Sequence, residues 1–212
     1  MTRPANGDTL LDSAGQALRH RVLFVPLLLG VLLSACRYKD ADRLFSSAKN
    51  GNKAALQQLT ALALQGDAQA QYNLGLMYAS GNSVPKDGAQ AAQWYQKAAE
   101  QGNAVAQNDL AVMYDYGNGI PRNLSKAFVL YRRAAEQGNR LAQRNLGVMY
   151  YRGEGVPRDL VLAYMWWNLV AVQSKDVLGE GAKESRDEIE AQMSPAEVAE
   201  AQRLSREWKP KR

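Results

Sequence analysis

Residues 68–103 read AQAQYNLGLMYASGNSVPKDGAQAAQWYQKAAEQGN, and they decide the fold because the chain repeats them. A shift of 36 residues brings this stretch onto residues 104–139, AVAQNDLAVMYDYGNGIPRNLSKAFVLYRRAAEQGN, without an insertion. Residues 140–175 open in the same register, RLAQRNLGVMYYRGEGVPRDLVLAYMWW, and then diverge. A fixed period of this length is typical of helical repeat arrays. The sequence therefore predicts three consecutive units, 68–103, 104–139 and 140–175.

Each unit carries two helical patterns of apolar residues. The first half has one apolar stripe at helical spacing, and the second half has small and aromatic residues at the same spacing. Small Ala residues allow two helices to approach closely. The first stripe comprises Ala70, Leu74, Met77 and Tyr78, then Ala106, Leu110, Met113 and Tyr114, then Ala142, Leu146, Met149 and Tyr150. The second comprises Ala91, Tyr95, Ala98 and Ala99, then Ala127, Tyr131, Ala134 and Ala135, then Ala163, Trp167, Val170 and Ala171.

Turn residues separate the two helices at matching positions of every unit. A Gly suits the left-handed residue that ends a helix, and Pro prevents the first helix from resuming. Asp and Asn are suitable N-caps for the second helix. These positions are Gly81, Gly117 and Gly153, then Pro85, Pro121 and Pro157, then Asp87, Asn123 and Asp159. Gly102 and Gly138 are predicted to end the second helices.

The units resemble the Sel1-like repeat, a relative of the tetratricopeptide repeat. The matching residues of the first unit are Leu74-Gly75, Tyr78, Gly81, Val84, Asp87, Ala91, Trp94-Tyr95, Ala98-Ala99 and Gly102. The second unit departs from the family pattern at Ala111, where the family has Gly, and at Asn123, where it has Asp. The resemblance implies an all-α fold, a right-handed α-solenoid of Sel1-like, TPR-like helix-turn-helix repeats with capping helices.

The segments that flank the repeats are predicted to cap the stack. Residues 36–67 would hold an N-terminal anchor and capping helices, in which 40–52 echo a second helix and 53–67 supply one more helix. Residues 176–212 would hold C-terminal capping helices and a basic tail. Ser194-Pro195-Ala196-Glu197 is a capping box that begins a helix to about Trp208, and another helix is expected at about 181–192. Terminal helices of this kind shield the last apolar face of a solenoid.

The N-terminal residues 1–35 have the order of a secretory signal. The basic residues Arg19 and Arg21 precede an apolar run from Val22 to Leu33, which is shorter than the roughly 20 residues that span a bilayer. The run ends in Leu33-Ser34-Ala35-Cys36, which resembles the lipobox of bacterial lipoproteins. The resemblance implies lipidation of Cys36, and Arg37 in place of Asp implies the outer membrane, facing the periplasm. An uncleaved anchor with an inert Cys36 is the alternative.

Two scarcities limit the chemistry of the remaining chain. The sequence holds one His, His20, and one Cys, Cys36, both in or beside the N-terminal segment. Without them the body of the protein has no Ser-His-Asp or Cys-His site, no zinc site with His or Cys ligands and no internal disulfide. The sequence thus predicts no catalytic residue, no cofactor and no metal. The formal charge of +5 is mild and spread along the chain, so it does not argue for nucleic acid. The last basic residues, from Arg206 to Arg212, are expected to form a solvated tail, with a weak contact to an anionic surface as the alternative.

Partner-binding residues are expected where the units differ and the side chains leave the core. A repeat solenoid exposes a concave face made mainly of first helices, and Tyr and Arg dominate interface energetics. The candidate positions are Tyr72, Asn108 and Arg144, then Asn73, Asp109 and Asn145, then Ser80, Tyr116 and Arg152, beside Asp115 and Tyr151. The cluster of Tyr116, Arg144, Tyr151 and Arg152 is the best candidate contact site, with ordinary solvated helix positions as the alternative. By contrast, Trp94, Trp166, Trp167, Tyr95 and Tyr131 lie at core spacing.

Three functions are compatible with these features. The family resemblance implies a non-catalytic scaffold that binds another protein of the cell envelope through the concave face. The second possibility is a module that binds glycan or peptidoglycan, for which Tyr116 with Tyr151 is the plausible aromatic pair. The third, disfavoured by the absence of repeated Cys pairs, is a hydrolase of the cell wall or of β-lactams.

Overall fold

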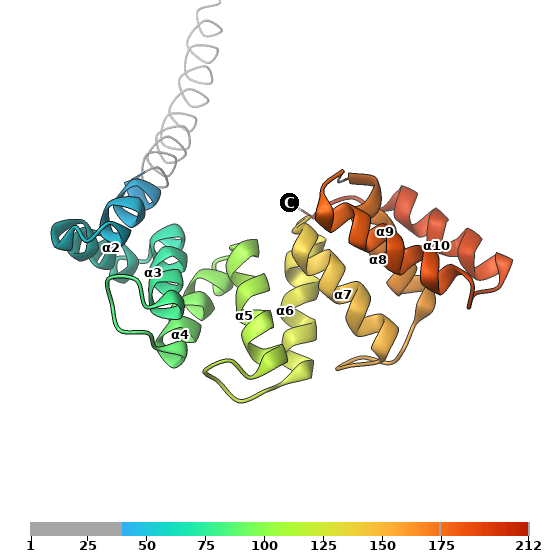
Figure 1. Ribbon diagram of the computed structural model, residues 1–212, viewed down its shortest axis with the longest axis horizontal. Helices are drawn as coiled ribbons and strands as arrows, with labels where there is room; N and C mark the ends of the chain where they lie inside the picture. The colour runs from blue at the N-terminus through green and yellow to red at the C-terminus, as the bar shows by residue number, and fades with distance from the viewer. Residues whose placement is uncertain (1–39, 174, 212) are drawn as a thin grey trace, which may run out of the picture.

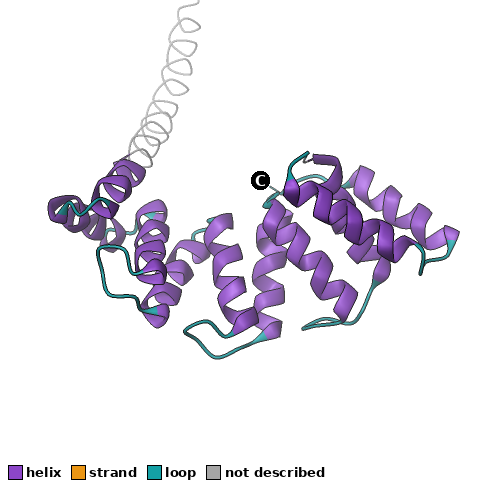
Figure 2. Cartoon of the chain, viewed as in Figure 1, coloured by secondary structure: helices purple, strands orange, loops and turns teal. Residues whose placement is uncertain are grey.

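The computed structural model describes residues 40–173 and 175–211, and this part of the chain is an all-α repeat solenoid (Figures 1 and 2). Residues 40–49 are helical, and nine further helices follow in the described range. They are α2 Lys53–Leu64, α3 Ala68–Ser80, α4 Gly88–Glu100, α5 Ala104–Tyr116, α6 Leu124–Glu136, α7 Arg140–Arg152, α8 Leu160–Gln173, α9 Val177–Glu190 and α10 Pro195–Glu207. The signal segment 1–35, Cys36 and Arg37 lie outside the described residues.

Each repeat is the helix-turn-helix unit that the sequence predicts. The C-cap glycines Gly81, Gly117 and Gly153 are all left-handed, with φ of 77°, 72° and 72°. The Asp87 carboxylate accepts the amide of Gln90, Asn123 caps α6 in the same way, and Asp159 accepts from Leu162 at 2.9 Å. A left-handed residue costs little only for Gly, so these positions fix where the first helices end.

Consecutive helices pack against one another, and apolar side chains fill the seams between them. Every predicted stripe residue is buried or partly buried, and the buried set includes Trp94, Tyr95, Tyr131, Trp166 and Trp167. The aromatic residues at core spacing therefore belong to the core. Helices α3, α5 and α7 line one side of the array, here named the first-helix face. Helices α4, α6 and α8 line the other, the second-helix face.

Buried glutamines join each unit to the unit before it, a feature that the apolar pattern does not predict. The Nε2 atoms of Gln71, Gln107 and Gln143 donate to the carbonyl oxygens of Ala63, Ala99 and Ala135 at 3.0, 3.0 and 3.2 Å. Within a unit, Gln101 and Gln137 in turn donate to Gln71 Oε1 and Gln107 Oε1 at 2.7 and 2.8 Å. A buried amide is stable only when it is hydrogen-bonded, so the bonds from Gln71, Gln107 and Gln143 fix the register between units.

The N-terminal cap takes a different register from the one suggested by the sequence echo. The Gln71 contact to Ala63 shows that α2 stands where α4 and α6 stand in the later units, as a second helix. The helix at residues 40–49 instead contacts the first helix α3, because Asp42 Oδ1 accepts from Gln69 and Asn73, both at 2.9 Å. The cap is therefore a shortened unit whose two helices are joined by a very short turn.

The C-terminal cap encloses α8. This helix, LVLAYMWWNLVAVQ, is apolar around its whole circumference and packs against α7, α9 and α10. Helix α10 begins at the predicted capping box, with Ser194 and Glu197 bonded reciprocally. A helix that is apolar all round is stable only when it is covered all round. The two terminal helices provide that cover.

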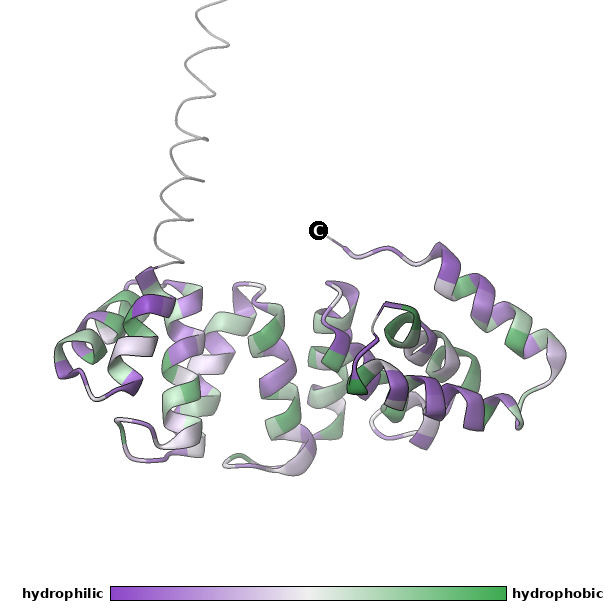
Figure 3. Cartoon of the chain, turned by 45° about the horizontal axis from the view of Figure 1, so that its top comes forward, coloured by the Kyte–Doolittle hydropathy of each residue, from purple (hydrophilic) through white to green (hydrophobic). Residues whose placement is uncertain are grey.

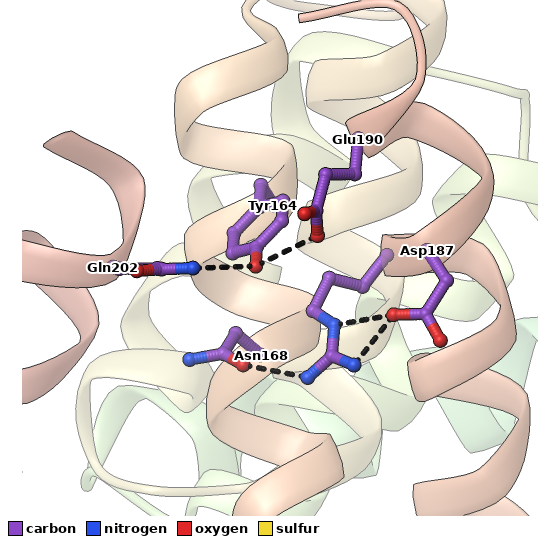
Figure 4. Close-up of polar contacts among 6 residues, drawn as sticks. Tyr164, Asn168, Asp187, Glu190 and Gln202 are labelled. Carbon is purple, nitrogen blue, oxygen red and sulfur yellow. Dashed lines mark hydrogen bonds and ion pairs between the residues drawn. The ribbon is translucent and has the colours of Figure 1, made fainter. Parts of the chain in front are cut away.

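Polar side chains tie the cap together (Figure 4). The Tyr164 hydroxyl of α8 donates to Glu190 of α9 at 3.1 Å and accepts from Gln202 of α10 at 3.3 Å. Arg186 of α9 donates to Asn168 of α8 at 2.9 Å and pairs with its neighbour Asp187. The charged side chains of α9 thus include one local ion pair, and Arg186 and Glu190 also reach across to α8.

The basic tail is docked as far as it is described, which corrects the expectation of a solvated end. The tail runs from α10 back toward the middle of the array (Figure 3). Trp208 packs edge-on against Trp166 with ring centroids 6.0 Å apart, and the Lys211 amide donates to the Glu136 carbonyl at 2.8 Å. The Lys211 ammonium also lies 2.9 Å from the Glu136 carboxylate. The apolar anchor at Trp208 holds the basic residues close enough to pair.

Candidate interaction site

Two of the predicted partner-binding positions are buried, and the structure corrects them. Asn73 is 2% exposed and Asn108 is 3% exposed. Asn73 donates to Asp42 of the helix at residues 40–49, and the Tyr72 hydroxyl donates to Asp109 Oδ2 at 3.1 Å across the α3–α5 seam. Neighbouring first helices approach so closely that these positions meet the next helix before they reach solvent. Tyr72, Asn73, Asn108 and Asp109 therefore form a seam between units.

The pKa values of Asp109 and Tyr72 are both shifted in that seam. Burial raises its pKa above the ordinary range, against hydrogen bonds from Asn108 and Tyr72 that lower it. Burial and the Asp109 charge raise the pKa of Tyr72 as well, so its hydroxyl stays a donor. This pair holds two repeats together and is not available to a ligand.

Five of the other predicted positions converge on one groove of the first-helix face. Tyr116 at the end of α5 and Arg144, Asn145 and Arg152 on α7 line a polar hollow of about 310 Å³, here named the α5–α7 groove. The Tyr116 ring is 71% exposed although it is large and aromatic. Five of the eleven candidate positions, Asp115 among them, therefore line one hollow, and one period separates the two helices that carry them.

The groove is lined by cations and anions that restrain one another, with one exception. Arg122 Nε donates to the Asp115 carbonyl at 2.7 Å, and Arg152 lies 3.9 Å from Glu154. Burial, then the charge of Glu154, raises the pKa of the Asp115 carboxyl, which also accepts the Tyr131 hydroxyl at 3.4 Å. Among the described residues, the Arg144 guanidinium has neither an ion-pair partner nor a hydrogen-bond acceptor. It is thus ready to bind an acceptor from another molecule.

Tyr151 lies apart from this groove. Its ring packs on Trp167 at 5.8 Å between centroids, and the Arg158 guanidinium lies 5.6 Å from the Tyr151 ring. Arg158 also donates to the Tyr151 carbonyl at 3.0 Å. Tyr151 is therefore engaged in packing at the C-terminal unit. The α5–α7 groove is lined by Tyr116 but not by Tyr151, so it does not join the aromatic pair expected for glycan binding.

A second groove lies on the second-helix face, and the sequence does not predict it. Residues of α4 and α6 line a hollow of about 1020 Å³, here named the α4–α6 groove. Its apolar lining comprises Ala89, Ala92, Tyr114, Ile120, Val129 and Leu130. The only signal in the sequence was Val129, an exposed apolar residue on a helix that otherwise presents charge to solvent. One such residue is common on any surface and is not informative by itself.

The fold defines the class, an α-helical repeat solenoid. Residues 68–103, 104–139 and 140–171 match the Sel1 repeat family, so the chain belongs to the Sel1 repeat proteins. Members of this family generally act as protein-interaction scaffolds, and the fold is typically non-catalytic.

Two solved structures are similar. A Sel1 repeat protein from Oxalobacter formigenes is 32% identical with a TM-score of 0.63, over 70% of this chain and 59% of that one. A protective antigen present in uropathogenic Escherichia coli strains, which displays an SLR fold, is 28% identical with a TM-score of 0.45, over 79% of this chain and 44% of that one. The present chain thus spans about half the length of these proteins. No curated protein matches the sequence.

The described residues contain no cluster of three or more His, Cys, Asp or Glu side chains that could hold a metal ion. None of their helices has the length and apolar character to cross a membrane.

Proposed function

We propose that this protein is a non-catalytic scaffold of the bacterial cell envelope that binds a partner protein at the α5–α7 groove. The observation that carries the proposal is the convergence of Tyr116, Arg144 and Arg152 at one exposed hollow. Tyr and Arg are the side chains that most often dominate binding energy at interfaces. The unpaired Arg144 guanidinium supplies hydrogen-bond donors. A hydrogen bond to an acceptor group of the partner would offset the free energy needed to remove these donors from water.

The size of the groove limits what it can hold. A hollow of about 310 Å³ accommodates a few side chains of a short segment, and it is too small for a folded domain. Val148 and Met149 form an apolar patch beside the charged rim, so a segment with one apolar side chain next to an acceptor group fits best. We therefore expect the partner to present a loop or a chain end.

Anchoring in the envelope is the part of the proposal that rests on sequence alone. Leu33-Ser34-Ala35-Cys36 resembles a lipobox, and it precedes the first described helix by only a few residues. Several acyl chains on Cys36 would hold the array at a membrane surface. The variant Cys36→Ala should shift the protein from the membrane fraction to the soluble fraction or leave an uncleaved precursor. A membrane association that survives this change would contradict the lipid anchor.

Crosslinking tests the binding site directly. A photoreactive amino acid at position 116 should give a discrete crosslinked product in cells, identified by mass spectrometry. The same group at Lys183, an exposed position of α9, serves as the control. Changing Arg144 to Ala should reduce the position 116 product about tenfold, because an interface Arg typically contributes more than 1 kcal/mol. Products of equal yield from both positions, insensitive to Arg144, would contradict the site.

The hydrolase alternative has its own test. The purified protein should show no turnover of nitrocefin or peptidoglycan above the buffer rate. Turnover that disappears on changing one residue of the repeats would overturn the scaffold proposal.

A further inference from the structure

The second-helix face carries two grooves related by one repeat, and only one of them is covered. The covered groove lies between α6 and α8, where the end of α10 and the tail pack. Trp208 meets Trp166 there, and Lys211 meets Glu136. The α4–α6 groove lies one repeat earlier and remains open over about 1020 Å³.

The two grooves correspond position by position. A shift of 36 residues brings Trp166 onto Leu130 and Glu136 onto Glu100. Leu130 and Glu100 both line the α4–α6 groove. The positions that receive the chain's own helix end in one groove thus lie unoccupied in the other. Because the two grooves are related by the repeat, we infer that the floor of the open groove can accept a helix as the floor of the covered groove does.

The rims of the two grooves differ in charge. Three cations, Lys97, Lys126 and Arg133, line the α4–α6 groove, and Glu100 is the acidic side chain among its lining residues. Glu100 accepts the Gln96 amide at 2.7 Å, and the three cations outnumber this one carboxylate, so the rim is positive on balance. In the covered groove the residue that matches Arg133 is the apolar Leu169, and the one that matches Lys126 is Leu162.

Aromatic rings hold two of these cations in place. The Lys97 ammonium lies 4.1 Å from the Trp94 ring centroid, and the Lys126 ammonium lies 5.1 Å from that of Tyr114. A cation over an aromatic face is oriented at low cost. The apolar floor is therefore bordered by positive charges in defined positions.

We propose that the α4–α6 groove is a docking site for an amphipathic helix of a partner protein whose apolar stripe is flanked by Glu or Asp. The apolar stripe would cover Ala92, Val129 and Leu130, as α10 covers α8. The acidic flanks would pair with Lys97, Lys126 and Arg133. Helix-in-groove recognition of this kind uses anchors at i, i+3, i+4 and i+7.

The charge of the groove disfavours a second copy of this chain as the occupant. The available segment would be the end of α10 and its tail, which carries Arg206, Lys209 and Lys211. These cations would face the cations of the groove. The proposed site is on the opposite face from the α5–α7 groove, so either site can be lost without the other.

Two synthetic helical peptides of 18 residues test the proposal by fluorescence anisotropy on the full chain. Both carry the same Leu stripe, and their flanks are all Glu in one peptide and all Lys in the other. We expect the Glu peptide to bind about tenfold more tightly at low salt, because each of three exposed ion pairs contributes a fraction of a kcal/mol. The difference should shrink in 0.5 M salt, where surface charges are screened.

A matched pair of variants locates the binding. Val129→Glu places a carboxylate in the α4–α6 groove, and Val105→Glu makes the same change on α5; these residues are 36% and 45% exposed, so both variants should fold. Val129→Glu should abolish binding of the Glu peptide, and Val105→Glu should leave it unchanged. Arg133→Glu should lower the preference for the Glu peptide at least threefold, since an exposed ion pair becomes a repulsion.

The outcomes are decisive in both directions. Equal affinity for the two peptides, absence of saturable binding, or equal loss in Val129→Glu and Val105→Glu would overturn the proposal. Concentration-dependent self-association that Val129→Glu abolishes would assign the groove to a second copy instead. None of these results depends on the photocrosslinks at position 116, which report on the other face.

Discussion

The second and third repeats share the helix-turn-helix backbone, but their second helices differ in how much of their surface is covered. Helix α6 of the second repeat is amphipathic, with Lys126, Arg132 and Arg133 exposed. Helix α8 of the third repeat is apolar on every side and is enclosed by α7, α9 and α10. One repeat therefore leaves its outer groove open, and the next closes it with the chain's own end.

This difference shows how a repeat array ends. Identical units would expose the same apolar seam at the last repeat as between internal repeats. The third unit departs from the common pattern after residue 171, where the match to the family also ends. Its additional apolar residues recruit α9 and α10, which bury Ala182, Ile189 and Ala201. The charged residues of α6 meanwhile keep the α4–α6 groove soluble and accessible.

Removing the Trp208 anchor should break the closed groove and have the largest effect. Trp208→Ala deletes the ring that packs on Trp166 and also frees the tail. We expect a loss of about 3 kcal/mol in the free energy of unfolding, near the lower end for a buried aromatic side chain because Trp208 is partly exposed. Urea unfolding followed by circular dichroism measures it.

The matched control for this change is Tyr116→Ala. Its ring is 71% exposed, so its loss should change the free energy of unfolding by less than about 0.5 kcal/mol. Similar losses in the two variants would mean that Trp208 is not the anchor of the cap.

Exchanging Gly and Ala between the second and third repeats tests how closely their two helices are packed. A Cβ on Gly147 would lie 2.5 Å from Trp167 Nε1, which donates to the Arg144 carbonyl at 3.1 Å. Ala111 occupies the matching position of the second repeat and is fully buried. Gly147→Ala should therefore cost about 1.5 kcal/mol through overpacking, although Ala favours helix. The midpoint of urea unfolding measures this.

The reverse exchange is the control. Ala111→Gly should cost about 1 kcal/mol, because Gly loses more backbone entropy in a helix and removes a buried methyl group. If Gly147→Ala stabilised the protein as an ordinary helix substitution does, the close approach of Trp167 would not limit packing in the third repeat.

The seam residues give the smallest effect, one that depends on pH. Burial raises the pKa of Asp109, while the third repeat has the neutral Asn145 at this position. An acid with a raised folded-state pKa binds more protons in the folded protein. Its contribution to stability is therefore full below the unfolded value of about 4 and is lost as pH rises through the folded pKa.

The variant Asp109→Asn copies the third repeat and should remove this loss. Unfolding free energies of both proteins from pH 4 to pH 8 should show that the wild type declines relative to the variant as pH increases. A difference between the two proteins that is constant over this range would show that the charge of Asp109 does not act through its raised pKa.

The candidate site was partly predictable. The variable positions Tyr116, Arg144, Asn145 and Arg152 were found from the repeat register, because residues that differ between units while leaving the core stripe are recognisable in sequence. Asn73 and Asn108 met the same criterion and are buried, since the criterion cannot tell how closely the next first helix approaches. Tyr151 also met this criterion, but its ring packs on Trp167, which comes from the other helix of the unit.

The sequence by itself determined the helices, their ends and the three repeats, because apolar spacing, capping residues and left-handed glycines act within a few residues of one another. It also determined the terminal caps in outline, through the capping box at Ser194 and the apolar run of α8. Only the tertiary structure decided which surfaces stay open. The glutamine pairs Gln101–Gln71 and Gln137–Gln107, the docking of Trp208 and the charged α4–α6 groove join residues some 30 or more positions apart. Such contacts depend on the angle at which one unit meets the next, and no local pattern encodes that angle.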